Sequence, residues 1–277
     1  MISGPSIAAN FVLFLAFAIS FHVHATWSIV AVDLEAREVG LAAATCNPGI
    51  QFIAAAVPGA GVVVAQAETS FKGRDQAGDW MAEGIGAEKI LQRLSNPAFY
   101  SGWFNAKFPD FQYGVATLTE GPQAGYTGGD NLILWFGGKS GAAYSVQGNT
   151  LRGEDVIADA ARAFEKREDG TCRLTLGERL LRALEAGRNA GGDKRCPLDK
   201  PALSAILITE PFPTDGDSKE GLADSLSLVT PEEISLLRAA YYLIVPYHPD
   251  ENATEPVKQL REKFEAARGK NCQVKTN

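Results

Sequence analysis

The stretch TWSIVAVDLEAREVGLAAAT, residues 26–45, decides the fold. It contains two short apolar runs, WSIVAVD at 27–33 and EVGLAAAT at 38–45, which the polar residues LEAR at 34–37 connect. Short apolar runs rich in Val, joined by a polar segment, are typical of a β-hairpin. The sequence therefore predicts that residue 26 opens a strand that enters the core.

Similar apolar runs follow at 50–68, at 111–149 and at 202–209. Strands are predicted in IQFIAAAVP (50–58), GVVVAQAE (61–68), FQYGVATLT (111–119), GPQAGYTG (121–128), LILWFGG (132–138), AAYSVQGN (142–149) and ALSAILIT (202–209). Between residues 68 and 111 the sequence predicts one helix that ends at Asn96-Pro97. One face of this helix is formed by residues that recur at spacings of four and three, which are Trp80, Gly84, Ala87, Leu91 and Leu94.

Three later segments also have helical spacing. Their apolar faces are Val156, Ala160 and Phe164; Leu176, Leu180 and Leu184, ended by Gly191-Gly192; and Val257, Leu260 and Phe264. The order of the predicted elements is strands, helix, strands, helices and strand. This order favours an α+β fold, in which packed antiparallel sheets have helices outside, over a parallel doubly wound sheet.

Residues 1–25 are predicted to be a secretory signal peptide. An apolar run from Phe11 to Phe21 precedes Val23-His24-Ala25, an acceptable cleavage site, although the segment before that run contains no Lys or Arg. No second apolar run of membrane length follows, so we expect no membrane span after the leader is removed. The remaining chain, 26–277, is expected to be a single secreted or periplasmic domain.

Composition argues against several classes of function. A formal net charge of −7 makes binding to nucleic acid or to anionic membranes improbable. The chain lacks GxGxxG, Walker and HExxH motifs, so we expect no cofactor. His248 is the one histidine after the leader, and its PYHPDEN context predicts an exposed turn rather than a metal ligand. Asp215, Asp217 and Glu220 are interpreted as a surface loop, not a calcium site.

Four cysteines follow the leader: Cys46, Cys172, Cys196 and Cys272. An even number in an exported protein predicts two disulfides, with three possible pairings. Cys172 with Cys196 is the preferred pair, because these two cysteines bracket one helical segment. The chain has no CxxC motif, so neither a redox site nor a zinc site is expected.

Cleavage after Ala25 would make Thr26 the first residue of the mature chain. An amino-terminal Thr combines a nucleophilic hydroxyl with its own base, because a free α-amine has a pKa of about 7.7–8.0 in model peptides. Such a residue needs no histidine. Thr26 is therefore either a catalytic nucleophile or an ordinary strand residue.

The chain resembles the domain of unknown function 1028 family over about residues 26–268. The resemblance rests on TWSIVAVDLEAREVGLAAAT, VPGAGVVVAQA, YSVQGNTLRGEDV, LEAGRNAGGDKR, SAILI and LIVPYHPDENATEPVKQLREKF in this order. It implies a fold like that of the N-terminal nucleophile (Ntn) hydrolases, a four-layer αββα sandwich of two antiparallel sheets. Members without a leader begin Met-Thr-Phe-Ser, so methionine removal would expose a threonine equivalent to Thr26.

Two departures from the family pattern concern the expected site. Proteasome-like relatives keep a lysine beside the nucleophile, and many family members carry Ser-Lys after the second strand. This chain has Thr45-Cys46-Asn47 there and no lysine between Thr26 and Lys72. Where relatives read Gly-Gly-Asp-x-Arg-Gly-x-Gln-Ser-Ala, this chain has GGDKRCPLDKPALSA, with a cysteine and an inserted loop.

Polar residues at predicted strand and helix ends complete the candidate site. Gly148 and Asn149 end a strand after Gln147 and either stabilise an oxyanion or cap a turn. Asp193 and Arg195 either hold their loop as an ion pair, the preferred interpretation, or orient the site. Gln66 and Glu68, on a strand expected near Thr26, are weaker candidates.

These observations lead to one functional hypothesis and one rival. The hypothesis is an exported Ntn-type amide hydrolase whose nucleophile is Thr26, acting without metal or cofactor on a small amide, a peptide or a cell-wall fragment. The rival is a non-catalytic binding or envelope protein on the same fold. Sheets of this kind often associate, so a homo-oligomer is also considered.

Overall fold

The computed structural model describes residues 26–100, 111–128, 134–170, 172–211, 241–250, 252–267 and 273–274. The strands in this part of the chain are β1 Thr26–Asp33, β2 Glu38–Thr45, β3 Ala54–Val57, β4 Gly61–Ala67, β5 Phe111–Thr117, β6 Ala124–Thr127, β7 Trp135–Gly141, β8 Tyr144–Leu151, β9 Glu168–Asp169, β10 Cys172–Arg173, β11 Ser204–Pro211, β12 Tyr241–Val245 and β13 Gln273–Val274. The α-helices are α1 Phe71–Ala82, α2 Ala87–Leu94, α3 Asp155–Glu165, α4 Leu176–Asn189 and α6 Pro256–Ala267.

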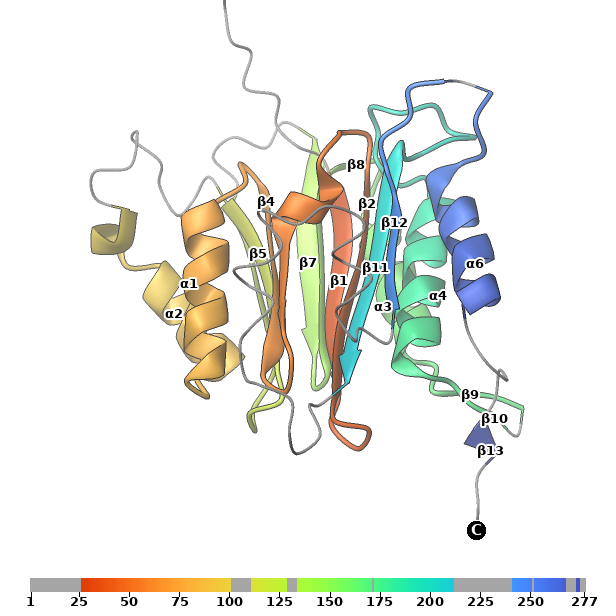
Figure 1. Cartoon of the computed structure of the whole chain (residues 1–277). Coiled ribbons are helices and arrows are strands. Elements are labelled where there is room, and N and C mark those ends of the chain that lie inside the picture. Colours follow the sequence, from red (N-terminus) through yellow and green to blue (C-terminus); the bar gives the residue numbers. More distant parts are fainter. Residues whose placement is uncertain are drawn as a thin grey trace, which may run out of the picture.

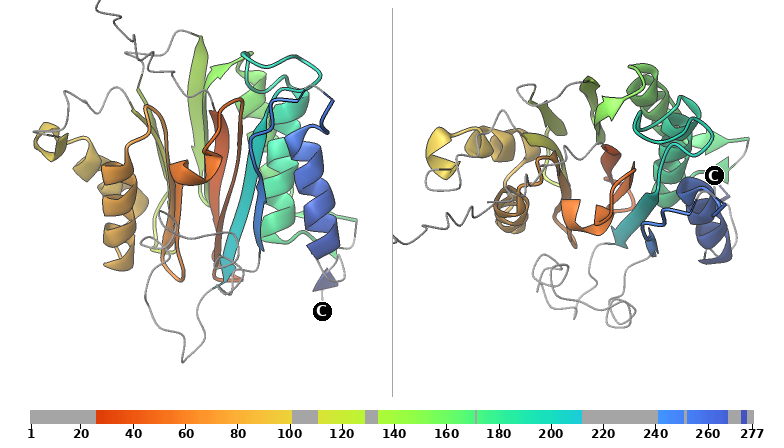
Figure 2. Two further views of the ribbon diagram at one scale, coloured as in Figure 1. Left: turned by 45° about the horizontal axis from the view of Figure 1, so that its top comes forward. Right: turned by 90° about the horizontal axis from the view of Figure 1, so that it is seen from above.

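Two antiparallel sheets pack face to face between helices (Figures 1 and 2). The larger sheet has the order β12-β11-β2-β1-β8-β7, and the smaller has the order β3-β4-β5-β6. Helices α1 and α2 cover the outer face of the smaller sheet, whereas α3, α4 and α6 cover the outer face of the larger one (Figure 1). The expected α+β arrangement of antiparallel sheets with helices outside is confirmed.

The predicted hairpin forms the centre of the larger sheet. Strand β1 pairs with β2 on one side and with β8 on the other, in unbroken antiparallel register. Alternate residues of β1 face opposite layers, as the two-residue period of a strand requires. Trp27 and Ile29 belong to the core beneath the helices, whereas Val30 and Val32 belong to the core between the sheets. Residues 26 and 28 consequently face the space between the sheets.

Helix α1 ends earlier than the spacing predicted, so the single expected helix is wrong. Residues 71–94 form two helices, α1 and α2, because Gly84 adopts a left-handed φ of 81°. The N–H groups of Gly84 and Ile85 donate to the carbonyls of Met81 and Trp80, which is the pattern of a Schellman C-cap. The helical spacing of residues 80–94 continues across the break at Gly84 although two separate helices carry it.

The other predicted helices and strands are present at nearly their expected positions, except that residues 50–53 of the strand expected at 50–58 form a 3-10 helix before β3. Strand β12 at 241–245 was not predicted. The apolar faces of α3, α4 and α6 are buried as predicted, and Gly191 and Gly192 follow α4 with positive φ. Within the described ranges no helix is long and apolar enough to cross a membrane. The predicted leader at 1–25 and the loop with Asp215, Asp217 and Glu220 lie outside the described residues.

Glycines of the smaller sheet make room for polar side chains of the larger one. A Cβ atom on Gly114 would lie 2.2 Å from Oε1 of Gln147, and a Cβ atom on Gly125 would lie 2.4 Å from Oγ of Ser145. Both Gln147 and Ser145 are fully buried. The two sheets can therefore approach at this point because these positions have no side chain.

We predict that Gly114→Ala destabilises the protein by about 1–3 kcal/mol, because the new methyl group would overlap the buried Gln147 amide. Urea unfolding of wild type and variant measures the change. Gly153→Ala is the matched control, since nothing lies within 4 Å of its added Cβ. A Gly114→Ala variant as stable as this control would contradict the packing described here.

Candidate active site

Thr26 is the first residue of β1 and lies where several strand ends meet. It is opposite Thr45 of β2 and opposite Asn149 of β8, and its own exposure is 1%. Paired residues of neighbouring strands point to the same face of a sheet. The side chains of Thr26, Thr45 and Asn149 therefore share the face that looks toward the smaller sheet.

A buried layer of amide and hydroxyl side chains continues inward from Thr26. Gln66 of β4 donates from Nε2 to the Thr26 carbonyl (3.3 Å) and accepts at Oε1 from the Ser28 hydroxyl (2.6 Å). Gln147 donates from Nε2 to the same Ser28 hydroxyl (2.6 Å) and accepts from Ser145 (3.0 Å). These bonds connect the two sheets immediately behind the first residue of β1.

Gln112 of β5 is the centre of this layer. Its Nε2 donates to Thr127 Oγ1 (2.8 Å) and to the carbonyls of Gly148 (2.9 Å) and Gly137 (3.3 Å). Its Oε1 accepts from Gln66 Nε2 (2.6 Å) and from Asn149 Nδ2 (3.0 Å). Sequence reasoning singled out Gln66 and Asn149 and missed Gln112, the residue that joins them.

Two non-glycine residues at this end have left-handed backbone. Ala67, which follows Gln66, has φ 70°, and Thr150, which follows Asn149, has φ 53°. Such a conformation is strained, above all for a β-branched residue, and costs of order 1–3 kcal/mol. Ala67 is the last residue of β4 and Thr150 is the second-last residue of β8, and each directly follows an amide of the buried layer. The fold tolerates this strain where the strands end beside Thr26.

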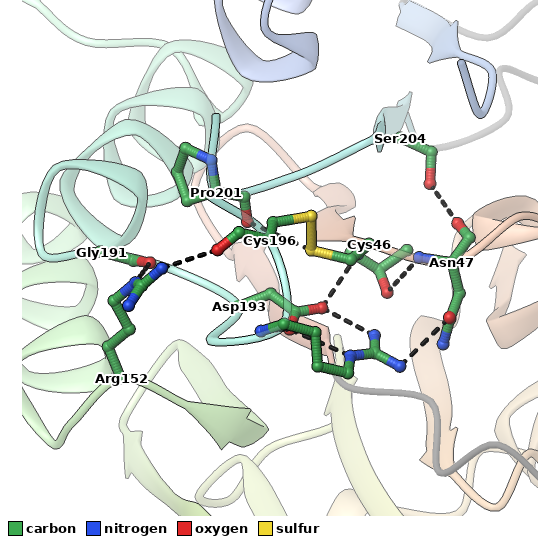
Figure 3. Close-up of a disulfide and its surroundings, with 10 residues drawn as sticks. Cys46, Asn47, Arg152, Gly191, Asp193, Cys196, Pro201 and Ser204 are labelled. Carbon is green, nitrogen blue, oxygen red and sulfur yellow. Dashed lines mark hydrogen bonds and ion pairs between the residues drawn. A yellow bond between two sulfur atoms is a disulfide. The ribbon is translucent and has the colours of Figure 1, made fainter. Parts of the chain in front are cut away.

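Asp193 and Arg195 form the predicted ion pair, and it ties together three segments (Figure 3). Arg195 Nη2 lies 2.7 Å from Asp193 Oδ2, and Asp193 is fully buried. The same carboxylate accepts the backbone N–H of Cys46 (2.9 Å), and Arg195 Nη1 donates to Asn47 Oδ1 (3.1 Å). The pair therefore fixes the segment after β2. Asp193 also forms an antiparallel β-bridge with Leu151 of β8, two residues after the Asn149 that lies opposite Thr26.

A disulfide closes the same region: Cys46 is bonded to Cys196, with Cα atoms 6.0 Å apart (Figure 3). The preferred pairing of Cys172 with Cys196 is wrong. Helix α4, with 14 residues, separates Cys172 from the loop that contains Cys196, a span of about 21 Å at the helical rise. A disulfide needs Cα atoms within about 7 Å. The Cys46–Cys196 bond fits an oxidising, extracytoplasmic environment.

The remaining predicted site residues have less central positions. Gly148 lies opposite Trp27, and a Cβ atom there would meet Leu151, so its side-chain position faces the helices. Glu68 is partly exposed beyond the end of β4. His248 lies in an exposed segment where its Nδ1 accepts the N–H of Asp250, as expected for a turn. No group of three potential metal ligands converges within the residues that the structure describes.

A polar pocket of about 420 Å³ lies at the opposite end of β1 and β2. Its lining includes Asp33, Glu38 and Arg173, and Arg173 Nη2 lies 3.0 Å from Asp33 Oδ2. Burial alone would raise the pKa of Asp33, but the N–H of Ala36 and the Arg173 guanidinium outweigh burial and hold this pKa below its usual value. The Asp33 carboxylate is thus committed to holding the β1–β2 turn.

Comparison with known proteins places the chain in a family. The family model described as "Family of unknown function (DUF1028)" matches residues 26–223. The chain belongs to the DUF1028 family. The crystal structure of protein SPO2555 from Silicibacter pomeroyi, also of DUF1028, is similar over 89% of this chain and 91% of that chain, with a TM-score of 0.63 and 23% identity. No curated protein matches this chain. The similarity to SPO2555 shows a shared fold.

We predict that Asp193→Asn destabilises the protein by about 2–3 kcal/mol, because a neutral amide would leave the Arg195 and Cys46 donors poorly paired in a buried position. Thermal unfolding at neutral pH measures the loss. The matched control is Asp159→Asn at the exposed pair with Arg162, where a change below about 0.5 kcal/mol is expected. Equal effects of the two substitutions would contradict the role given to Asp193.

Proposed function

We propose that this DUF1028 protein is an exported Ntn-type amide hydrolase in which Thr26 is the amino-terminal nucleophile. The observation that carries the proposal is the position of Thr26, buried at the first residue of a central strand and opposite Asn149. A nucleophile held at the end of a rigid sheet has the fixed geometry that catalysis requires. The family match also begins at residue 26, which supports treating residues 1–25 as a separable leader.

In the proposed reaction the Thr26 hydroxyl oxygen attacks the carbonyl carbon of an amide, and the hydroxyl proton passes to the α-amine of the same residue. The second N–H of the Asn149 amide, beyond the one donated to Gln112, and nearby backbone N–H groups stabilise the oxyanion. That the backbone N–H of Gly148 also stabilises the oxyanion stays a prediction. The amine then gives its proton to the leaving nitrogen, and the C–N bond breaks to leave an ester on Thr26.

Water completes the cycle. The α-amine takes a proton from the water molecule, whose oxygen attacks the ester carbonyl, and the carboxylic acid leaves as Thr26 recovers its hydroxyl proton. The missing lysine does not prevent this sequence, because burial lowers the pKa of an amine and so keeps the basic form populated at neutral pH. Asp193 and Arg195 serve here as positioning residues for the segment after Thr45.

The rival proposal, a binding protein without chemistry, draws on one specific observation. After β2, where many relatives are expected to carry Ser-Lys, this chain has Thr45-Cys46-Asn47, and the sulfur of Cys46 is bonded in a disulfide. A covalent probe of the nucleophile separates the two proposals, because a binding protein would hold the probe reversibly.

We predict that a β-lactone acylates Thr26 in the exported protein, giving one added probe mass located on the amino-terminal peptide by mass spectrometry. Thr26→Ala should abolish the label and Thr26→Ser should retain it. The sharpest control inserts one alanine between Ala25 and Thr26, which keeps the hydroxyl but moves the α-amine to another residue; we expect at least a hundredfold slower labelling. Equal labelling with and without the inserted alanine would contradict an amine-assisted nucleophile.

A further inference from the structure

The orientation of the Asn149 amide follows from the partners of Gln112. Gln112 Nε2 faces the carbonyls of Gly148 and Gly137, which can only accept hydrogen bonds. The nitrogen of Gln112 must therefore be on that side and its oxygen on the other. That oxygen lies 3.0 Å from the Asn149 amide, so Asn149 must present its nitrogen to Gln112.

Asn149 Oδ1 is then turned away from Gln112. It is buried and has no hydrogen-bond partner among the described residues, and Asn149 as a whole is 0% exposed. Nearly all buried side-chain oxygens in folded proteins accept a hydrogen bond, because an unsatisfied one destabilises the fold. The functional form of the protein should contain a donor that none of the described residues supplies.

The backbone of β1 directs the nitrogen of Thr26 toward Asn149. Val32 donates its N–H to the carbonyl of Ala143 (2.9 Å), so Val32 forms a hydrogen-bonded pair with the strand of Asn149. Hydrogen-bonded pairs alternate along an antiparallel ladder, and the register from Thr26 to Ala31 has no irregularity. Six residues before Val32, Thr26 therefore also points its backbone nitrogen at β8, opposite Asn149.

We propose that Asn149 Oδ1 accepts a hydrogen bond from the α-amine of mature Thr26 and is the positioning residue for the catalytic base. Before cleavage the nitrogen of residue 26 carries one hydrogen, which the β8 ladder uses. Cleavage adds further N–H groups, and one of them supplies the donor that Asn149 Oδ1 lacks. This bond turns the amine lone pair toward the Thr26 hydroxyl and leaves Asn149 Nδ2 for Gln112 and the oxyanion.

The inference rests on the proposed function in one respect, that Thr26 is the first residue of the mature chain. It concerns the amine rather than the reaction, so it can be tested without turnover. The pKa of the Thr26 α-amine is measured by trace acetylation with acetic anhydride across pH 5–10, followed by mass spectrometry of the amino-terminal peptide.

We expect Asn149→Leu to lower the α-amine pKa by about one pH unit, because the ammonium form loses a hydrogen-bond acceptor in a buried site. Gln147→Met is the matched control: it removes another buried amide from the same face of β8 that contacts Ser28 and Ser145 and not Thr26. This control should leave the pKa within about 0.3 pH unit of wild type. Equal shifts in both variants, or none in Asn149→Leu, would overturn the inference.

A crystal structure of the wild-type mature protein decides the matter if Asn149→Leu does not fold. A Thr26 N to Asn149 Oδ1 distance within about 3.2 Å supports the inference, and Oδ1 bonded to another donor overturns it. Failure of the proposed function is distinguishable: a shifted pKa without β-lactone labelling retains the positioning role and refutes catalysis. β-Lactone labelling of Thr26 with an unshifted α-amine pKa in Asn149→Leu supports catalysis and refutes the positioning role of Asn149.

Discussion

Gln112 connects the two sheets at the end where Thr26 lies, because its side-chain amide makes five hydrogen bonds with groups from both sheets. Each neighbour of Gln112 has its own donors and acceptors arranged to match. Gln66 faces Thr26 and Ser28 as a consequence, and Asn149 turns its oxygen away. A buried polar layer of this kind is stable when all its members are satisfied, which makes the orientation of each amide interdependent.

A second constraint holds the end of β2, whose last residue, Thr45, lies opposite Thr26. The Cys46–Cys196 disulfide and the Asp193 carboxylate both join the end of β2 to the loop after α4. A covalent link across 150 residues of sequence restricts the unfolded chain strongly, which in the chain-entropy model stabilises the fold by about 4–5 kcal/mol. The end of β2 thus has a covalent connection that depends on an oxidising environment.

Local patterns predicted most of the fold. The hairpin at 26–45, the other strands of both sheets except the edge strand β12, and the helices α3, α4 and α6 each have their signal within a short window of sequence. The single helix expected across Gly84 was wrong, because spacing cannot show a left-handed residue. Among the site residues, Thr26 and Asn149 are brought together and Asp193 and Arg195 are paired, as expected.

What the sequence could not show depends on contacts between distant segments. Gln112, inside FQYGVAT, looks like any solvent-facing polar residue of a strand until the other sheet is placed against it. The disulfide was foreseeable in part, since the length of α4 argues against Cys172 with Cys196. Its true partner required knowledge that the end of β2 and the loop after α4 meet.

The measurement that tests the central claim most directly is the intact mass and amino-terminal sequence of the exported protein. The account predicts a chain that begins at Thr26, shortened by residues 1–25, with Cys46 and Cys196 oxidised. A mature chain that begins at any other residue would place no free α-amine beside the Thr26 hydroxyl. That result would contradict the claim that Thr26 is an amino-terminal nucleophile.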